Sequence, residues 1–427
     1  RCLKKEFKFM DSSVCQWQWG FLLLLLQCFS LMMVAYPTLQ TTPPDEEFCR
    51  AIPKVELHAH LHGSIRESTL LDLAQAQGLE TPTLITESDE RTLDECFKIF
   101  NTIHKIVTSK EIIQRITREV LEDFAIDGVK YVELRTTPRS LPDGTTPKEY
   151  VLAVLQVLEE YIDEHGGEAS ILEAMQVPVP RLLLSVDRGG TAAAALATAR
   201  LAAELAAQSR LVVGIDFSGN PFKGTFKEFR PAFELARANN LSITMHCAEI
   251  DNTEDSKAIL DFRPDRIGHM VAMSSEVELA LLSIEPPIPI EICPSSNYKT
   301  LDLNSHRDHP TVKKWLMLGY PFSVNTDDTG VFGTSLSKEL CIIAEAFHLD
   351  SEAVKQISLA TVQHIFDRKL VPVLQDRFES VMERLMVFPG AASTMGGVVL
   401  DHREQESSVK SVGGSSRSIP EMQSVEL

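Results

Sequence analysis

The 427-residue sequence contains no Cys-x-x-Cys pair, and its eight cysteines follow no regular spacing. A disulfide-bonded scaffold is therefore excluded, because such scaffolds are short chains with dense, regularly placed cysteines. Cys247 and Cys293 lie inside apolar, strand-like segments, where a cysteine usually serves as a small buried hydrophobic residue. This cysteine usage favours a reducing compartment, and we expect a cytoplasmic protein.

Basic residues are also scarce, since 41 Lys and Arg stand against 60 Asp and Glu and give a formal net charge of −19. Such a balance argues against wrapping nucleic acid or lying on an anionic membrane. A small anionic ligand is still compatible with it, provided that local cations and backbone amides receive the ligand. We expect a monomer with a small-molecule ligand, with no nucleic-acid polymer and no obligatory protein partner.

The two ends of the chain differ in composition from the middle. Residues 20–36 form an apolar run with the length of a signal-peptide core or a short membrane anchor, and either of these stays open as an alternative. We expect residues 1–47, which end in a Pro- and Thr-rich stretch, to be a leader and linker outside the fold. Residues 48–388 are expected to form a single folded domain, and residues 389–427, rich in Ser, Gly and charge, a disordered tail.

Eight apolar, strand-like segments alternate with helical patterns, and no internal repeat is evident beyond this alternation. The first strand ends at His60, and the others are predicted at 130–139, 181–186, 211–217, 241–247, 266–269, 289–293 and 321–326. Two of the helices are expected to begin with capping boxes at Ser64 and Thr92, and residues 166–180 are expected to be an irregular loop. Polar clusters follow most strands, which predicts an α/β fold, a (β/α)8 TIM barrel. An open doubly wound sheet, the alternative, would concentrate them at one switch point.

Metal-ligand residue types follow three of the predicted strands. His58 and His60 share one face of the first strand because strand side chains alternate with period two. His246 ends the fifth strand and Asp327 follows the eighth, which is the neighbour of the first strand in a closed barrel. Three imidazoles and one carboxylate suit a single Zn²⁺ ion with a position left for water. Taken alone, a His-x-His match arises by chance and a single histidine is more often structural.

Other ionisable side chains at strand ends are candidates for acid–base chemistry. Glu249 follows His246 by three residues and could deliver a proton to a substrate, or simply cap the next helix. His269 could take or hold the proton of an attacking water, and Asp328 is expected to face substrate or water. Gly219 permits close backbone approach to a ligand, although a tight turn is an equal alternative.

The end of the second strand carries groups that suit a phosphate. Thr136 and Thr137 offer two hydroxyls, and Arg139 offers a guanidinium group two residues later. The alternative interpretation of this stretch is a solvated loop.

Five motifs occur in a characteristic order: His-Ala-His-Leu at 58–61, Ser-Gly-Asn at 218–220, His-Cys-Ala-Glu at 246–249, Arg-Ile-Gly-His at 266–269 and Asn-Thr-Asp-Asp at 325–328. From about residue 52 to residue 367 the chain thereby resembles the adenosine and AMP deaminase superfamily of metal-dependent hydrolases. Segments 91–97, 129–139 and 183–188, with His104, look like the adenosine deaminase-like branch of that superfamily.

The resemblance implies zinc-dependent hydrolytic deamination at purine C6. It implies that Glu249 donates a proton to the purine ring, that His269 assists the water, and that Asp328 and Gly219 hold the purine. It implies zinc ligation by His58, His60, His246 and Asp327. It also implies nucleotide contacts from His60, His104, Thr136, Thr137, Pro138, Arg139 and Asp187.

One residue departs from the pattern of the resembling proteins. After His-Ala-His-Leu the branch has Asn and adenosine deaminases have Asp, whereas this chain has His62. A neutral His, like Asn, can donate one hydrogen bond, so we count His62 among the candidate substrate-binding residues. An acidic residue there would repel a phosphate, so its absence favours a nucleotide over a nucleoside.

The expected reaction is conversion of N6-methyl-AMP to IMP and methylamine. An adenosine deaminase acting on the nucleoside is the first alternative, and a non-catalytic nucleotide-binding or secreted protein that keeps the barrel is the second. A cytidine-type deaminase is disfavoured, because the Pro-Cys-x-x-Cys signature of that class is absent.

Overall fold

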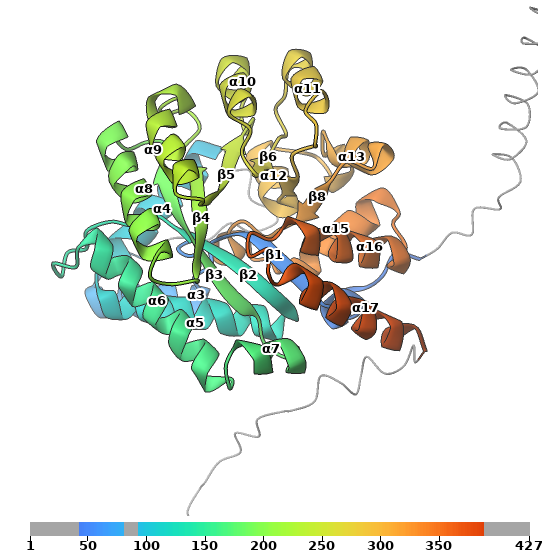
Figure 1. The fold of residues 1–427 in the computed structure, drawn as a ribbon, viewed down its shortest axis with the longest axis horizontal. Coiled ribbons are helices and arrows are strands. Elements are labelled where there is room, and N and C mark those ends of the chain that lie inside the picture. Colours follow the sequence, from blue (N-terminus) through green and yellow to red (C-terminus); the bar gives the residue numbers. More distant parts are fainter. Residues whose placement is uncertain (1–41, 81–92, 388–427) are drawn as a thin grey trace, which may run out of the picture.

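Eight parallel strands form the centre of the molecule, and each strand pairs with the next one along the chain (Figure 1). The computed structural model describes residues 42–80 and 93–387. The strands are β1 (Lys54–His60), β2 (Val129–Thr136), β3 (Val179–Asp187), β4 (Val212–Ser218), β5 (Ser242–Cys247), β6 (Arg266–His269), β7 (Ile290–Ile292) and β8 (Phe322–Val324). Their side chains are almost all buried, as expected for parallel strands covered on both faces.

The first and last strands meet just beyond the end of β8 and close the barrel. Ala59 forms a parallel bridge with Asp327, where the His60 amide donates to the Asp327 carbonyl (2.9 Å) and the Asp327 amide donates to the His58 carbonyl (2.8 Å). The Glu56 carboxylate also accepts hydrogen bonds from the amide and the hydroxyl of Thr326, at 3.0 and 2.8 Å. The predicted (β/α)8 barrel is therefore confirmed, with all eight carboxyl strand ends at one rim.

Helices surround the strands, as Figure 1 shows. They are α2 (Glu46–Ala51), α3 (Glu67–Gln77), α4 (Leu93–Ile106), α5 (Lys110–Ile126), α6 (Pro147–Glu164), α7 (Glu168–Ala174), α8 (Ala192–Ala206), α9 (Phe226–Ala238), α10 (Thr253–Phe262), α11 (Ser275–Leu282), α12 (Pro294–Thr300), α13 (Val312–Leu318), α14 (Thr329–Phe332), α15 (Leu336–Phe347), α16 (Ser351–Thr361) and α17 (Val371–Val387). Within the described ranges, none of these helices is both long and apolar enough to cross a bilayer. The apolar run at 20–36 lies outside those ranges.

Local sequence accounts for several helix boundaries. Pro147 occupies the first turn of α6, and Thr146 and Glu149 form a reciprocal capping box. Gly78 ends α3 in the left-handed conformation (φ 64°), as its position after the helical pattern predicts.

Two expected local features are wrong. The predicted capping box at Ser64 does not form, because α3 begins only at Glu67 and the Ser64 amide donates instead to the His60 carbonyl (3.0 Å) in the loop after β1. The predicted loop at 166–180 contains α7, whose Glu168 is held by an ion pair with the buried Arg181 (2.6 Å). A distant partner thus stabilises a short helix that local periodicity does not reveal. The second expected capping residue, Thr92, lies outside the described residues.

Charged side chains fill part of the barrel interior. Arg266 on β6 contacts Glu133 on β2 and Glu291 on β7, both at 2.6 Å. Arg135 on β2 contacts Glu291 at 2.9 Å and Asp216 on β4 at 3.1 Å. All five side chains are essentially inaccessible to solvent, so each charge depends on its partners.

Replacing Arg266 by Met should lower the free energy of unfolding by about 3–5 kcal/mol, because Glu133 and Glu291 would be left buried without their shared cation. Urea unfolding followed by circular dichroism measures the loss. The matched control is Arg50→Met, which removes the exposed ion pair with Glu46 and should cost no more than about 1 kcal/mol. Equal effects of the two substitutions would contradict a structural role for the buried layer.

Candidate active site at the carboxyl rim of the barrel

Three imidazoles and one carboxylate converge at the rim. The Nε2 atoms of His58 and His60 each lie 3.1 Å from the Nε2 atom of His246. The Asp327 Oδ1 atom lies 3.4 Å from His58 Nε2 and 3.3 Å from His60 Nε2. The structure therefore brings together the four side chains that the sequence predicts as metal ligands.

Backbone strain accompanies this convergence. Asp327 and His269 adopt left-handed backbone conformations, with φ of 61° and 66°, which cost energy for residues other than glycine. The Asp327 backbone is held by the bridge to β1 described above. The residue after His269 is Met270, and its amide donates a hydrogen bond to the Cys247 carbonyl (3.0 Å). These hydrogen bonds keep both side chains turned toward the rim.

Buried carboxylates set the orientation of two of the imidazoles. His58 Nδ1 lies 2.8 Å from Glu291 Oε2, and His246 Nδ1 lies 3.1 Å from Asp216 Oδ1. Arg135 contacts both carboxylates, and its charge helps to hold the pKa of Glu291 and of Asp216 well below the ordinary value in spite of burial. An ionised carboxylate can only accept, so each Nδ1 carries the proton and each Nε2 presents a lone pair to the cluster.

This donor set fits a divalent cation. Lone pairs of neutral imidazoles 3.1 Å apart repel each other unless a positive charge lies between them. Atoms that ligate zinc tetrahedrally at about 2.0 Å lie roughly 3.3 Å apart, close to the separations found here. Burial opposes a charge on His58, and still Asp327 and Glu291 raise its pKa to about 9, so without a metal ion a proton would occupy its Nε2 atom, and the cluster favours a positive charge there. An overlapping set, in which His269 stands with His58, His246 and Asp327, is likewise compact enough to hold a metal ion.

Glu249 and Asp328 turn carboxyl groups toward the same cluster. Within the described part of the chain, Glu249 Oε2 and Asp328 Oδ1 are buried atoms without a hydrogen-bond partner. Burial raises the pKa of both carboxyl groups, and the nearby Asp327 raises that of Asp328 further. Gly63 makes room for Asp328, because a Cβ atom at position 63 would lie 1.6 Å from Asp328 Oδ1. The raised pKa values favour the protonated form of both carboxyl groups, which is the form that can donate a proton.

A second group of predicted residues lies around Arg139. The Arg139 guanidinium donates to His62 Nε2 at 2.8 Å, and its own Nε is buried without a partner. The His62 ring packs edge-on against His104 (5.2 Å between centroids) and parallel to Tyr150 (6.1 Å). Thr136 Oγ1 is hydrogen-bonded to the Tyr150 hydroxyl at 2.5 Å. Burial lowers the pKa of Arg139, whose guanidinium has no acidic partner in the described part of the chain.

The remaining predicted residues lie in the loops at the same rim. Thr137 and Pro138 are half-buried between Thr136 and Arg139. Asp187 is exposed at the end of β3, and its carboxylate accepts from the Gly189 amide (2.7 Å). Gly219 (φ 99°) approaches it so closely that a Cβ atom there would lie 2.2 Å from Asp187 Oδ1. The roles of these residues in substrate binding stay predictions.

Sequence reasoning missed the residues that orient the imidazoles. Asp216, Glu291 and Arg135 lie inside strands, where only the residues at strand ends were considered. A signal was present, because Asp216 stands between Ile and Phe and Glu291 between two Ile residues. A carboxylate inside an apolar strand of a barrel has to be paired, which marks it as part of a polar network.

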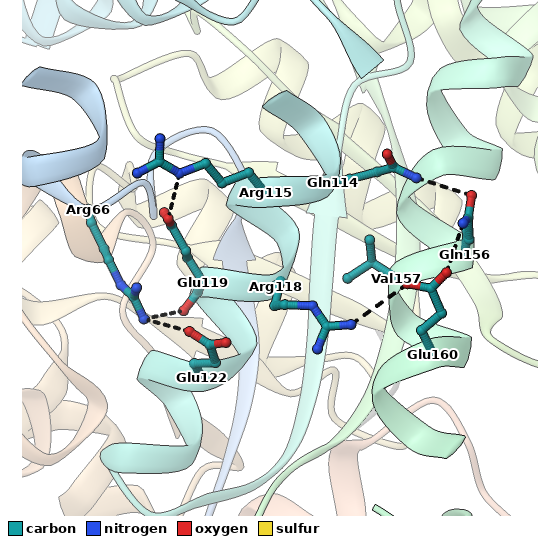
Figure 2. A pocket seen from close by; sticks show the side chains of 9 residues that line it. All are labelled: Arg66, Gln114, Arg115, Arg118, Glu119, Glu122, Gln156, Val157 and Glu160. Carbon is teal, nitrogen blue, oxygen red and sulfur yellow. Dashed lines mark hydrogen bonds and ion pairs between the residues drawn. The ribbon is translucent and has the colours of Figure 1, made fainter. Parts of the chain in front are cut away.

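An open groove of about 460 Å³ lies elsewhere, on the outer surface of α5 and α6 (Figure 2). Its arginines are already paired with carboxylates: Arg66 with Glu122 (3.1 Å), Arg115 with Glu119 (2.8 Å) and Arg118 with Glu160 (3.7 Å). Partly exposed ion pairs of this kind are ordinary features of helix surfaces. The groove is lined by Arg66, Gln114, Arg115, Arg118, Glu119, Glu122, Gln156, Val157 and Glu160.

A closed eight-stranded barrel with imidazoles and carboxylates gathered at its carboxyl rim has the architecture of a metal-dependent hydrolase. A family model described as adenosine deaminase matches residues 53–369. The chain therefore belongs to the adenosine deaminase family, and it is a purine aminohydrolase.

Individual relatives are similar over most of the chain. The N6-mAMP deaminase of Arabidopsis thaliana is 39% identical over 341 residues, which cover 75% of this chain and 94% of the relative. The N6-methyl-AMP deaminase of Homo sapiens is 37% identical over 335 residues, covering 76% and 91%. The solved structure of Arabidopsis ADAL complexed with IMP superposes with a TM-score of 0.70 at 36% identity and covers 79% of this chain and 99% of that one.

Substituting Asp216 by Asn should weaken zinc binding about 10- to 100-fold, because the carboxylate that keeps the His246 proton on Nδ1 is lost. Competition with a chromophoric chelator measures the affinity. Asp143→Asn, which makes the same change at an exposed loop carboxylate, should leave the affinity unchanged. An unaltered affinity in Asp216→Asn would show that Asp216 does not orient His246.

Proposed function

We propose that the chain is a zinc-dependent hydrolase that converts N6-methyl-AMP to IMP and methylamine. The observation that carries the substrate class is the half-buried Arg139 guanidinium, which lacks an acidic partner among the described residues and lies beside His62 at the rim that holds the cation cluster. A half-buried cation of this kind is stabilised by a ligand anion, and a phosphate monoester supplies one with matching geometry. The names of the relatives and the IMP bound to Arabidopsis ADAL support the same choice.

Zinc would be held by His58, His60, His246 and Asp327. When bound, it supplies a Lewis acid that lowers the pKa of water toward about 7. Asp216 and Glu291 keep two of these imidazoles oriented, and the acidic interior behind them favours positive charge at the cluster.

Glu249 is the proton donor of the proposed reaction. Burial raises the pKa of its carboxyl group and so favours the protonated form, and its Oε2 atom has no partner within the described structure. In that form it can transfer its proton to a purine ring nitrogen as oxygen adds at C6, and this step neutralises the charge that would develop on the ring. Burial and the nearby Asp327 raise the pKa of Asp328 well above its ordinary value, which suits Asp328 to donate a hydrogen bond to the ring and hold its plane. The net reaction consumes one water and releases one methylamine.

Turnover of N6-methyl-AMP, AMP and adenosine at equal concentrations tests the proposal, with methylamine or ammonia as the measured product. We expect the methylated nucleotide to react fastest and adenosine to react slowest. Faster turnover of adenosine would contradict the nucleotide assignment. Stoichiometric zinc without turnover of any of the three would contradict the proposed activity.

Glu249→Gln should lower kcat by about 10²- to 10⁴-fold, because an amide keeps the shape of the side chain but cannot transfer a proton. The pKa of Glu249 is raised, and the protonated, active form is lost as the pH rises through that pKa. The wild-type rate should therefore fall on the alkaline side, and this limb should vanish in Glu249→Gln. Glu379→Gln, an exposed change on α17, serves as the control and should leave the profile intact.

His62 decides between nucleotide and nucleoside in this proposal. His62→Asp places a carboxylate on Arg139 and near an incoming phosphate, and should raise the KM for N6-methyl-AMP at least about 10-fold. The KM for adenosine should change little. His62→Asn keeps an uncharged acceptor for Arg139 and should stay near wild type for both substrates. If the Asp and Asn variants behave alike, charge at this position does not select the substrate.

A further inference from the structure

His269 differs from the other imidazoles of the cluster in the partner of its Nδ1 atom. His58 and His246 face carboxylates there, whereas His269 Nδ1 lies 3.0 Å from the side-chain amide nitrogen of Asn297 on α12. A carboxylate can only accept a hydrogen bond, but an amide presents either a donor or an acceptor. Which group faces His269 therefore determines where its proton lies.

A second histidine, His309, determines how the Asn297 amide is turned. The backbone amides of Thr311 and Val312 both lie 3.4 Å from His309 Nδ1 and donate toward it. A neutral His309 must then carry its proton on Nε2, and burial lowers its pKa to about 4, so it is neutral at physiological pH. His309 Nε2 lies 3.2 Å from Asn297 Oδ1, which accepts a hydrogen bond from it.

The orientation of the amide follows from donor and acceptor matching alone. Since Asn297 Oδ1 accepts the hydrogen bond from His309 Nε2, the Asn297 NH₂ group has to face His269 and donate to its Nδ1. Asn297, His309 and His269 are 1%, 5% and 2% exposed, so water does not substitute for any of these partners. An Nδ1–H form of His269, neutral or charged, would place two donors against each other.

We propose that Asn297 and His309 are positioning residues that hold His269 with its proton on Nε2, so that His269 donates a hydrogen bond to the reacting oxygen instead of removing a proton from it. Only a nitrogen lone pair can accept a proton, and in this form the lone pair is on Nδ1, turned away toward Asn297. His269 Nε2 lies 4.0 Å from Glu249 Oε1, too far for a hydrogen bond between them.

The partner of each Nδ1 atom also distinguishes the proposed metal ligands His58 and His246 from His269. His58 and His246 present Nε2 lone pairs to a metal ion because their Nδ1–H groups donate hydrogen bonds to Glu291 and Asp216. His269 presents an Nε2 proton, so it does not ligate a metal even though its ring lies within 5.1 Å of the His246 ring. The identity of the reacting oxygen rests on the proposed function, whereas the position of the proton does not.

Nuclear magnetic resonance of the zinc-loaded full chain, labelled with ¹⁵N-histidine, tests the position of the proton directly. Two-bond ¹⁵N–¹H correlations distinguish a ring protonated on Nε2 from one protonated on Nδ1, and a His269→Gln sample assigns the signal. We expect Nε2 protonation of His269. Protonation on Nδ1, or metal ligation by Nε2, would overturn the proposal whether or not the chain turns over N6-methyl-AMP.

The Asn297→Asp variant distinguishes a donor role of His269 from a base role, because the two roles predict opposite changes in kcat. The carboxylate keeps the shape and still accepts from His309, but it also demands a proton on His269 Nδ1 and frees the Nε2 lone pair. If His269 acts as a donor, kcat should fall about 100-fold with KM little changed. If it acts as a base, the more basic Nε2 should keep or raise kcat, and the proposal fails.

The control for this variant is Asn239→Asp, the same chemical change on the exposed C-terminal turn of α9, which should leave kcat unchanged. Zinc content and circular dichroism verify that both variants are folded and loaded. If Asn297→Asp does not fold, the wild-type resonance measurement still decides the proposal.

Discussion

The rim of this barrel depends on one constraint: carboxylates buried between strands must stay ionised. Arg135 and Arg266 make this possible for Asp216 and Glu291, whose pKa values they lower. Once ionised, Asp216 and Glu291 fix the Nδ1 protons of His246 and His58 and turn both Nε2 lone pairs toward Asp327. The cation site is thus a consequence of charge pairing deeper in the barrel, since the orienting partners of metal-binding histidines largely determine affinity.

Opposite electrostatic conditions lie side by side at the rim. Around Asp327 the barrel interior is acidic and favours a cation, whereas Arg139 is a half-buried cation with a neutral histidine as its hydrogen-bond partner. Between these two environments, burial raises the pKa of Glu249 and of Asp328 and favours their protonated forms. A purine nucleotide, with a ring that takes up a proton and a phosphate that carries charge, is complementary to all three conditions.

The sequence predicted the architecture well because strand periodicity and strand-end polarity are local signals. All eight strands lie where apolar segments predicted them, and His58, His60, His246 and Asp327 converge although up to 269 positions separate them along the chain. Local signals failed where contacts outside the segment determine the structure. The first residue of α7, Glu168, forms an ion pair with Arg181, and the chain at Ser64 forms a loop after β1 where a capping box was expected. Asp216, Glu291 and Asn297 were missed because their importance lies in which ring nitrogen they face, which only the closed barrel determines.

Anomalous diffraction at the zinc absorption edge, from crystals of the purified chain, tests the central claim most directly. The charge pairing described above predicts a single strong peak within ligand distance of His58 Nε2, His60 Nε2, His246 Nε2 and Asp327, with His269 outside the coordination sphere. Absence of a peak at the rim, or a peak ligated by His269 in place of one of the other three imidazoles, would contradict the claim that the buried carboxylates select the ligands.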